Sequence, residues 1–328
     1  MVRNLSILFF AQFAAATGSI TLVTLGGIIG TELSAKPALA TLPLSLMVVG
    51  TAASTIPAAL LMRAIGRPLG SAAAAGTAVL AFLIGALSLK TGSFALLCLA
   101  LTLNGVNLAF VQQYRFAAAE SVSPDRVGRA VSIVLLASIG GAIAGPLLAR
   151  TTRHLVAGTE YAGTMLSLAA LMAVSAALLL FLNRDGHAAH QDTQAPTRPL
   201  REIVLQPLYV VAVMGGVAAY GIMSFIMTAT PISMHVVDGF SIEETSGVIR
   251  SHVIAMYAPS LVSGFLIERF GVLRLMGVGA IAMLLTSVIG LAGHAMMHYW
   301  FALVLLGIGW NFLYVGGTTL LTRTYRSQ

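Results

Sequence analysis

The sequence predicts an all-α polytopic membrane protein, a helix bundle of two pseudo-symmetric halves with about ten transmembrane helices. Three observations carry this prediction: the composition, the spacing of apolar runs and an internal repeat. Hydrophobic residues make up 58% of the 328 residues and charged residues only 9%, whereas an ordinary soluble domain has about 25% charged residues. A soluble protein needs polar side chains over most of its surface. The composition therefore excludes a soluble enzyme and a nucleic-acid-binding domain.

Apolar runs of about 20 residues, the length that spans a bilayer core, recur along the chain. The runs are rich in Ala, Gly and Leu and do not alternate with polar residues, so they predict helices rather than barrel strands. In order they cover residues 5–29, 38–62, 69–89, 93–113, 129–149, 161–182, 207–230, 245–267, 273–293 and 299–321. The first run is too long for a signal peptide, and we interpret it as an uncleaved first helix.

Lys and Arg gather in alternate gaps between the runs, and this orients the chain because cytoplasmic loops are enriched in these residues. With the N-terminus inside, the inner gaps hold Arg3, Arg63, Arg67, Arg115, Arg126, Arg129, Arg184, Arg198, Arg201, Arg269, Arg274, Arg323 and Arg326, and the outer gaps hold Lys36, Lys90, Arg150 and Arg153. We interpret the net charge of +7 as loop charge and not as a nucleic-acid-binding surface. Both termini are expected in the cytoplasm, and the protein in the cell membrane.

A polar stretch at 183–206 contains two prolines and no apolar periodicity, and it is predicted to be a cytoplasmic linker. It separates an N-terminal six-helix half at 1–182 from a C-terminal half at 207–328. An internal repeat supports the division. Gly105 and Asn107 match Gly309 and Asn311 at an offset of 204 residues, and the segment 59–67 matches 264–272 at an offset of 205.

Two short motifs can be placed by the internal repeat and by the order of the predicted helices. Residues 264–271 read GFLIERFG, and the degenerate first-half copy at 59–67, ALLMRAIGR, shares Leu61 and Gly66 with it and ends in Arg67. Residues 141–146 read GAIAGP. Both motifs, in this topology, resemble those of the major facilitator superfamily of secondary transporters. The resemblance departs in two respects: Leu101 stands where the family has an arginine, and the chain stops after ten helices where the family has twelve, so that the second half would hold four.

This resemblance implies a major-facilitator-like bundle that is a transporter and not an enzyme, and it assigns a gating role to the motif residues. The cytoplasmic latch would consist of Gly264, Glu268, Arg269 and Gly271, with a weaker copy at Gly66 and Arg67 and with Glu120 as a partner for Arg67. In the fifth helix, Gly141, Gly145 and Pro146 would form a close-packing, bent face of the kind associated with antiporters. The alternatives are surface charge that only sets topology, and a plain packing face with a kink.

Polar residues inside apolar spans are costly, and they usually face a cavity. The substrate-binding candidates are Gln12, Asn104, Asn107, Arg250, His252, Tyr257, Trp310 and Asn311, with Tyr314 nearby. We expect Asn107 and Asn311 to face each other across the pseudo-two-fold axis. Arg250 would bind an anionic substrate or extend to the outer interface. His252 would carry a proton or form a hydrogen bond within the bundle.

The predicted function is secondary transport of a small organic solute by alternating access, with proton-coupled efflux favoured by the motif at 141–146. No acidic residue lies in the middle of a span, so His252 is the leading proton carrier, and uncoupled facilitation stays open. The alternatives are an uptake permease for an anionic metabolite and a non-transporting fragment. We expect a monomer in the lipid bilayer with a small-molecule substrate. The lone Cys98 permits no intrachain disulfide, and no motif indicates a metal or cofactor.

Overall fold

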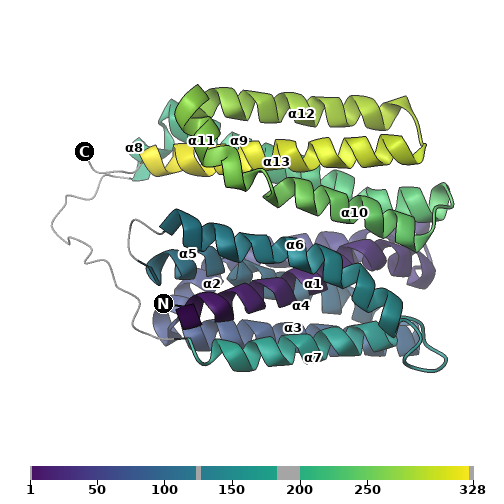
Figure 1. Ribbon diagram of the computed structural model, residues 1–328. Helices are drawn as coiled ribbons and strands as arrows, with labels where there is room; N and C mark the ends of the chain where they lie inside the picture. The colour runs from purple at the N-terminus through teal and green to yellow at the C-terminus, as the bar shows by residue number, and fades with distance from the viewer. Residues whose placement is uncertain (1, 123–126, 183–199, 325–328) are drawn as a thin grey trace. The chain divides into compact units, whose positions relative to one another are not determined.

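The computed structural model describes residues 2–122, 127–182 and 200–324, and within these ranges the chain folds into helices joined by short connections (Figure 1). The elements are α1 (Val2–Leu33), η1 (Pro37–Leu39), α2 (Leu42–Ile65), α3 (Arg67–Thr91), α4 (Phe94–Val111), α5 (Tyr114–Glu120), α6 (Val127–Thr152), α7 (Ala162–Leu179), α8 (Leu200–Val204), α9 (Pro207–Pro231), η3 (Ile232–Val237), α10 (Ile242–Tyr257), α11 (Ser260–Phe270), α12 (Val272–Ala292) and α13 (Met296–Thr324). Among the described residues, 9 helical segments are long and apolar enough to cross a membrane. This confirms the predicted all-α membrane fold.

The described chain forms two compact units. One unit holds residues 2–182 together with 228–246, and the other holds 200–227 together with 247–324. The first unit therefore includes η3, the C-terminal end of α9 and the N-terminal end of α10. The linker predicted at 183–206 is described only from residue 200 onward, where α8 begins.

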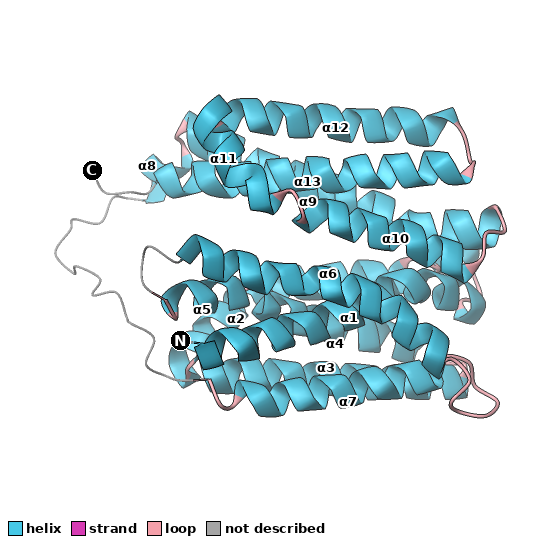
Figure 2. Ribbon diagram, in the orientation of Figure 1, coloured by secondary structure: helices cyan, strands magenta, loops and turns pink. Residues whose placement is uncertain are grey.

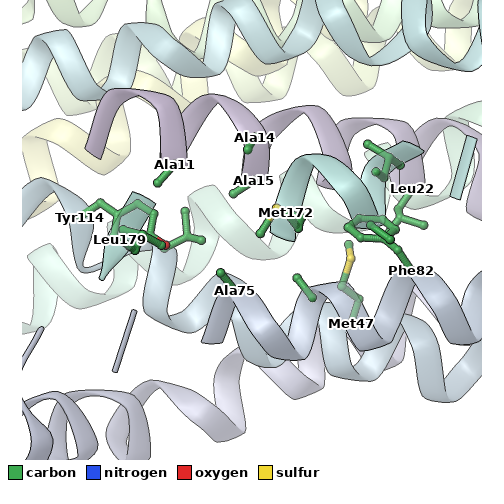
Figure 3. Packing of buried hydrophobic residues seen from close by; sticks show 14 of the residues in the cluster. Ala11, Ala14, Ala15, Leu22, Met47, Ala75, Phe82, Tyr114, Met172 and Leu179 are labelled. Carbon is green, nitrogen blue, oxygen red and sulfur yellow. The ribbon is translucent and has the colours of Figure 1, made fainter. Parts of the chain in front are cut away.

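The core of the first unit depends on small residues that let its helices approach closely. Figure 3 shows alanines of α1 and α3, among them Ala14 and Ala75, in one buried cluster with larger side chains such as Phe82 and Met172. The Phe82 ring lies against Gly18, where a Cβ atom would stand 2.6 Å from its Cζ atom. Close helix approach through small residues is typical of membrane bundles, because lipid provides no hydrophobic drive for association.

The second unit contains an antiparallel pair, α12 and α13, whose backbones come into close contact (Figure 2). A Cβ atom on Gly279 would lie 3.0 Å from the carbonyl oxygen of Gly309, and a Cβ atom on Gly309 would lie 2.9 Å from that of Gly279. The two glycines therefore face each other at the crossing. Gly309 is one of the residues on which the internal repeat was identified.

The eighth predicted span, 245–267, is not one helix. It divides into α10 and α11 around Ala258 and Pro259. Proline has no amide hydrogen and its ring disfavours a helical residue before it, so a break at this point has a local cause. A hydropathy profile does not detect such a break, because both helical pieces remain apolar.

The turns after α2 and α11 have nearly the same backbone conformation. Gly66, between α2 and α3, has φ 87° and ψ 155°, and Gly271, between α11 and α12, has φ 87° and ψ 149°. Positive φ favours glycine because it has no Cβ atom. The paired conformations support the repeat that the sequence suggested.

Candidate functional site

Four aromatic side chains gather within the second unit. The rings of Trp310 and Tyr314 stack with centroids 4.7 Å apart and planes tilted by 17°. Tyr220 of α9 stands nearly perpendicular to both, with centroids 5.4 Å from each. Tyr257, the last residue of α10, stands at 70° to Trp310 with centroids 6.0 Å apart. These four residues are called the aromatic cluster below.

Trp310 is the most enclosed member of the aromatic cluster. It is 3% exposed, whereas the three tyrosines are half-buried. Its indole Nε1 is buried and has no hydrogen-bond acceptor among the described residues. A buried donor without a partner is costly, so this N–H group is a candidate for contact with a ligand.

Asn311, next to Trp310, holds the break between α10 and α11. Its Nδ2 donates to the carbonyl oxygen of Met256 at 2.7 Å and to Ser260 Oγ at 2.6 Å. Its Oδ1 accepts from Ser263 Oγ at 2.9 Å. The amide is therefore committed on both sides to the two pieces of the divided span. Its predicted contact with substrate stays a prediction, and the observed role is to join α13 to the break.

His252 and Arg250 of α10 have opposite environments, as expected of helix neighbours two residues apart. Arg250 is exposed. His252 is fully buried, and its Nδ1 lies 2.8 Å from the carbonyl oxygen of Leu303. A carbonyl only accepts, so Nδ1 carries the hydrogen and Nε2 is left as an acceptor. That Nε2 is buried and has no partner within the described residues.

The corresponding region of the first unit joins α2 to α4. Asn104 Nδ2 lies 3.5 Å from the Met47 sulfur, a weak contact. Asn107 is 1% exposed, and its Oδ1 has no partner in the described part of the chain. Gly105 lies directly on the backbone of Met47, where no Cβ atom would fit. The two candidate asparagines of α4 are thus enclosed beside α2, and one carbonyl oxygen there remains available.

The motif at 141–146 packs against α1 within the first unit. A Cβ atom on Gly141 would stand 2.6 Å from the Ala16 Cβ atom, and one on Gly145 would stand 2.9 Å from Thr21 Oγ1. Pro146 lies inside α6 without ending it. On the same pair of helices, Gln12 Nε2 donates to Ser138 Oγ at 2.9 Å. The glycines make α1 and α6 a close pair, and an interface role for them stays a prediction.

The latch residues are placed only in part. Arg67 begins α3 and is half-buried, whereas Gly264 and Arg269 are exposed on α11. The side chains of Glu120 and Glu268 lie outside the described residues, so the pairing of Glu120 with Arg67 stays a prediction. Gly66 and Gly271 are the members of this set for which a local physical requirement, the positive φ, is visible.

Several contacts were not anticipated from the sequence. Tyr220 was overlooked in an apolar run, although a tyrosine in the middle of a span is itself a signal. At the loop after α6, Arg153 pairs with Glu160 at 3.0 Å, and the hydrogen bond to Glu160 raises the pKa of Arg153. Its guanidinium lies 5.0 Å from the Tyr161 ring centroid, and burial raises the pKa of Tyr161 to about 12. Among the described residues no group of three metal-ligating side chains occurs.

Comparison with known protein families gives a match over nearly the whole chain. The family model described as Major Facilitator Superfamily matches residues 8–328. The chain is 38% identical over 325 residues to the riboflavin transporter RfnT of Brucella anthropi, with 98% of this chain and 80% of that protein covered. It is 28% identical over 343 aligned positions to the uncharacterized MFS-type transporter YdeG of Bacillus subtilis, covering 97% of this chain and 77% of that protein.

Solved structures agree on the fold. The nucleoside transporter NupG superposes with a TM-score of 0.68 at 12% identity, with 98% of this chain and 83% of that chain covered. A bacterial homologue of the human lysosomal transporter Spinster, in an inward-facing and occupied conformation, superposes with a TM-score of 0.67 at 14% identity, covering 98% and 76%. At such identities the likeness concerns the fold alone.

Proposed function

The chain belongs to the Major Facilitator Superfamily, and on this premise we propose that it is a secondary transporter whose substrate is riboflavin or a closely related flavin. Membership makes it a multi-pass membrane transporter of a small molecule and not an enzyme. The observation that carries the choice of substrate is the 38% identity, over 98% of the chain, to a riboflavin transporter.

The chemistry of the candidate residues suits this substrate. Riboflavin has a planar three-ring heterocycle, and planar heterocycles bind through stacking on aromatic side chains. The aromatic cluster offers such surfaces, with Trp310 at its centre. The flavin ring is uncharged near neutral pH and needs no buried counter-charge. Arg250, the residue that motivated an anionic substrate, is exposed, and this favours the flavin over an anionic metabolite.

The proposed cycle is alternating access between the half at 1–182 and the half at 207–328, with both termini and the glycine turns at Gly66 and Gly271 on the cytoplasmic side. Asn107 would present its Oδ1 to the imide N–H of the flavin. Charge pairs that form in one state and separate in another can bias such an equilibrium. Arg269 and Glu268 would supply the latch. Its test is Glu268→Ala, which should lower turnover more than substrate affinity, whereas wild-type turnover at matched expression would refute the latch.

Coupling belongs to the same proposal. No Asp or Glu lies in the middle of a predicted span, so a proton that accompanies the substrate would need another carrier. His252 is buried, and its Nε2 has no partner among the residues that the structure describes, which makes it our proposed carrier. An imposed pH gradient should then drive flavin movement in the wild type, and His252→Gln should abolish the drive while exchange survives.

The experiment is riboflavin counterflow in vesicles that contain the purified full chain. Vesicles loaded with unlabelled riboflavin should accumulate labelled riboflavin transiently, and protein-free vesicles should not. The assay reports translocation whichever direction operates in the cell. Failure of purified, folded protein to exchange riboflavin would refute the proposal. Gradient-driven flux that is unchanged in His252→Gln would refute the coupling alone.

A further inference from the structure

We infer that Trp310 is the element that recognises the substrate ring: its indole face stacks on a planar heteroaromatic ligand, and its N–H donates a hydrogen bond to an acceptor at the edge of that ring. The inference rests on the proposed function and goes further, because it specifies which part of the substrate is read. The ring is recognised in this subsite, and the sugar-alcohol chain of riboflavin is not.

The indole N–H group of Trp310 is buried without an observed acceptor among the described residues. Trp310 is 3% exposed, and its Nε1 meets no acceptor within the part of the chain that the structure describes. Water serves buried polar groups where two to four polar partners can hold it. The ring contacts of this indole are with three tyrosines. A ligand with a hydrogen-bond acceptor on the edge of a flat ring would satisfy this N–H group.

The geometry of the neighbours is the second observation. The Tyr314 ring stacks on the Trp310 ring in a nearly parallel plane, while the Tyr220 and Tyr257 rings stand at 79° and 70° to the indole. Offset-stacked and perpendicular arrangements are those that aromatic rings prefer. A further flat ring can therefore take the place of one tyrosine on the indole without meeting an unfavourable ring arrangement. A flexible polyol has no face to offer here.

The break in the divided span lies directly after Tyr257, whose ring packs on Trp310. Tyr257 is the last residue of α10, directly before the break. Asn311 follows Trp310 in sequence and bonds the carbonyl oxygen of Met256, which precedes Tyr257. Movement at the break would therefore shift the Tyr257 ring against Trp310. It would also strain the hydrogen bond from Asn311 of α13 to Met256. The ring that covers the indole stands at the point where α10 is interrupted.

The ligand class follows from these steps. It is a planar heteroaromatic compound with a hydrogen-bond acceptor on its edge, which describes the flavin ring system. Lumiflavin, which keeps this ring system but has a methyl group in place of the sugar-alcohol chain, should compete with riboflavin. Ribitol, which is the chain without the ring, should not.

The test uses the two tryptophans of the chain. Trp300 lies on the same helix, is 41% exposed and donates to Ser251 Oγ at 3.1 Å, so Trp300→Phe leaves Trp310 as the sole indole reporter. Riboflavin and lumiflavin should each quench the remaining fluorescence in a saturable way, and ribitol should not. Binding affinities of all variants are read from the fluorescence polarisation of riboflavin itself.

Two substitutions separate the N–H from the ring face. Trp310→Phe keeps an aromatic face and loses the donor, so the Kd for riboflavin should rise about two- to tenfold. Trp310→Leu loses both, and the Kd should rise by about tenfold more. Trp300→Leu is the matched control and should bind as the wild type does. If Trp310→Leu does not fold, Trp310→Phe and lumiflavin competition on the wild type decide the question.

Wild-type affinity in both Trp310 variants, or riboflavin binding that lumiflavin does not compete for, would overturn the inference while leaving flavin transport intact. Saturable quenching by lumiflavin in a chain that does not exchange riboflavin would have the opposite meaning: the ring subsite would stand and flavin transport would fail.

Discussion

The pair α2 and α4 in the first unit and the group α10, α11 and α13 in the second are related by the internal repeat, and they start from the same packing device. Gly105 of α4 lies on the backbone of Met47, and Gly307 of α13 lies on the backbone of His252, where a Cβ atom would stand 2.6 Å from the carbonyl oxygen. In each region a glycine permits close approach of two helices. Met47 and His252 correspond at the repeat offset of 205 residues.

The two regions then diverge. In the first, α2 continues through Pro57 as one helix, and the hydroxyl of Thr55 bonds the carbonyl oxygen of Thr51 at 2.9 Å. In the second, the helix is interrupted at Ala258 and Pro259, and Asn311 donates hydrogen bonds to Met256 before the break and to Ser260 after it. The difference shows that the side-chain amide at one repeat position can hold helices together, while the Oδ1 of its counterpart, Asn107, has no partner within the described ranges.

The largest effect is expected where the two regions agree. Gly105→Ala and Gly307→Ala each force a methyl group into backbone atoms, so each should lower the free energy of unfolding by about 3 kcal/mol, the upper end for overpacking. Gly76→Ala, in α3 with nothing within 4 Å of the added Cβ atom, is the control. Thermal midpoints of the full chain in detergent measure this. A control as unstable as the two variants would refute the packing argument.

Asn311→Leu and Asn107→Leu should separate the two regions. Asn311→Leu removes three hydrogen bonds, and at about 0.6 kcal/mol for each interhelical bond in a membrane protein the loss is about 2 kcal/mol. Asn107→Leu breaks no hydrogen bond of Oδ1 to a described residue, so it should lower the thermal midpoint much less. Riboflavin affinity should nevertheless fall about tenfold, as for a lost buried hydrogen bond. Equal loss of stability in both would contradict the divergence.

Removal of each proline should have a smaller effect, confined to the second region. Pro259→Ala restores an amide hydrogen at the break and lets α10 continue into α11, so riboflavin turnover should fall several-fold with no loss of stability. Pro57→Ala lies in a helix that is already continuous and should leave turnover unchanged. Initial rates of counterflow at matched protein amounts measure both. A turnover defect of equal size in Pro57→Ala would mean that the break is not special.

The smallest effect is expected from the first turns of α2 and α10, both of which belong to the first unit. At the start of α10, Glu244 Oε2 accepts from the backbone N–H and the hydroxyl of Ser241, each at 2.8 Å, and these bonds lower the pKa of Glu244 below its usual 4.5. A lowered pKa means that this stabilisation is present above the usual value and is lost as the pH falls through the lowered one. Thr41, at the start of α2, makes no such bond.

Glu244→Gln should therefore lower the thermal midpoint slightly at neutral pH and not at strongly acidic pH, where the wild type has lost the same contribution. Thr41→Ala should have no effect at either pH. A Glu244→Gln difference that persists unchanged into strong acid would contradict the role assigned to the carboxylate.

The sequence was sufficient for the class of fold, because hydropathy over about 20 residues reports membrane burial directly. It also identified the glycine turns, since Gly66 and Gly271 carry a positive φ that few other residues adopt. It did not reveal the break at Pro259, because both sides stay apolar and Pro57 shows that a proline alone does not decide the matter. Nor did it reveal the partners of Asn311, since these depend on which residues three helices bring together.

The aromatic cluster was half visible in the sequence. Tyr257, Trp310 and Tyr314 stood out as polar or aromatic residues in apolar spans, but Tyr220 lies on a separate helix and joins them only through packing. Sequence analysis also gave no means to distinguish Asn107 from Asn311, which occupy equivalent repeat positions.

We propose that this chain transports flavins and recognises the flavin ring through Trp310. Riboflavin counterflow measured side by side in vesicles with equal amounts of wild type, Trp300→Leu and Trp310→Leu tests it most directly. The account predicts full exchange for the wild type and Trp300→Leu, and exchange reduced at least about tenfold for Trp310→Leu at a riboflavin concentration below the wild-type Kd. Equal exchange in all three proteins, or none in the wild type, would contradict it.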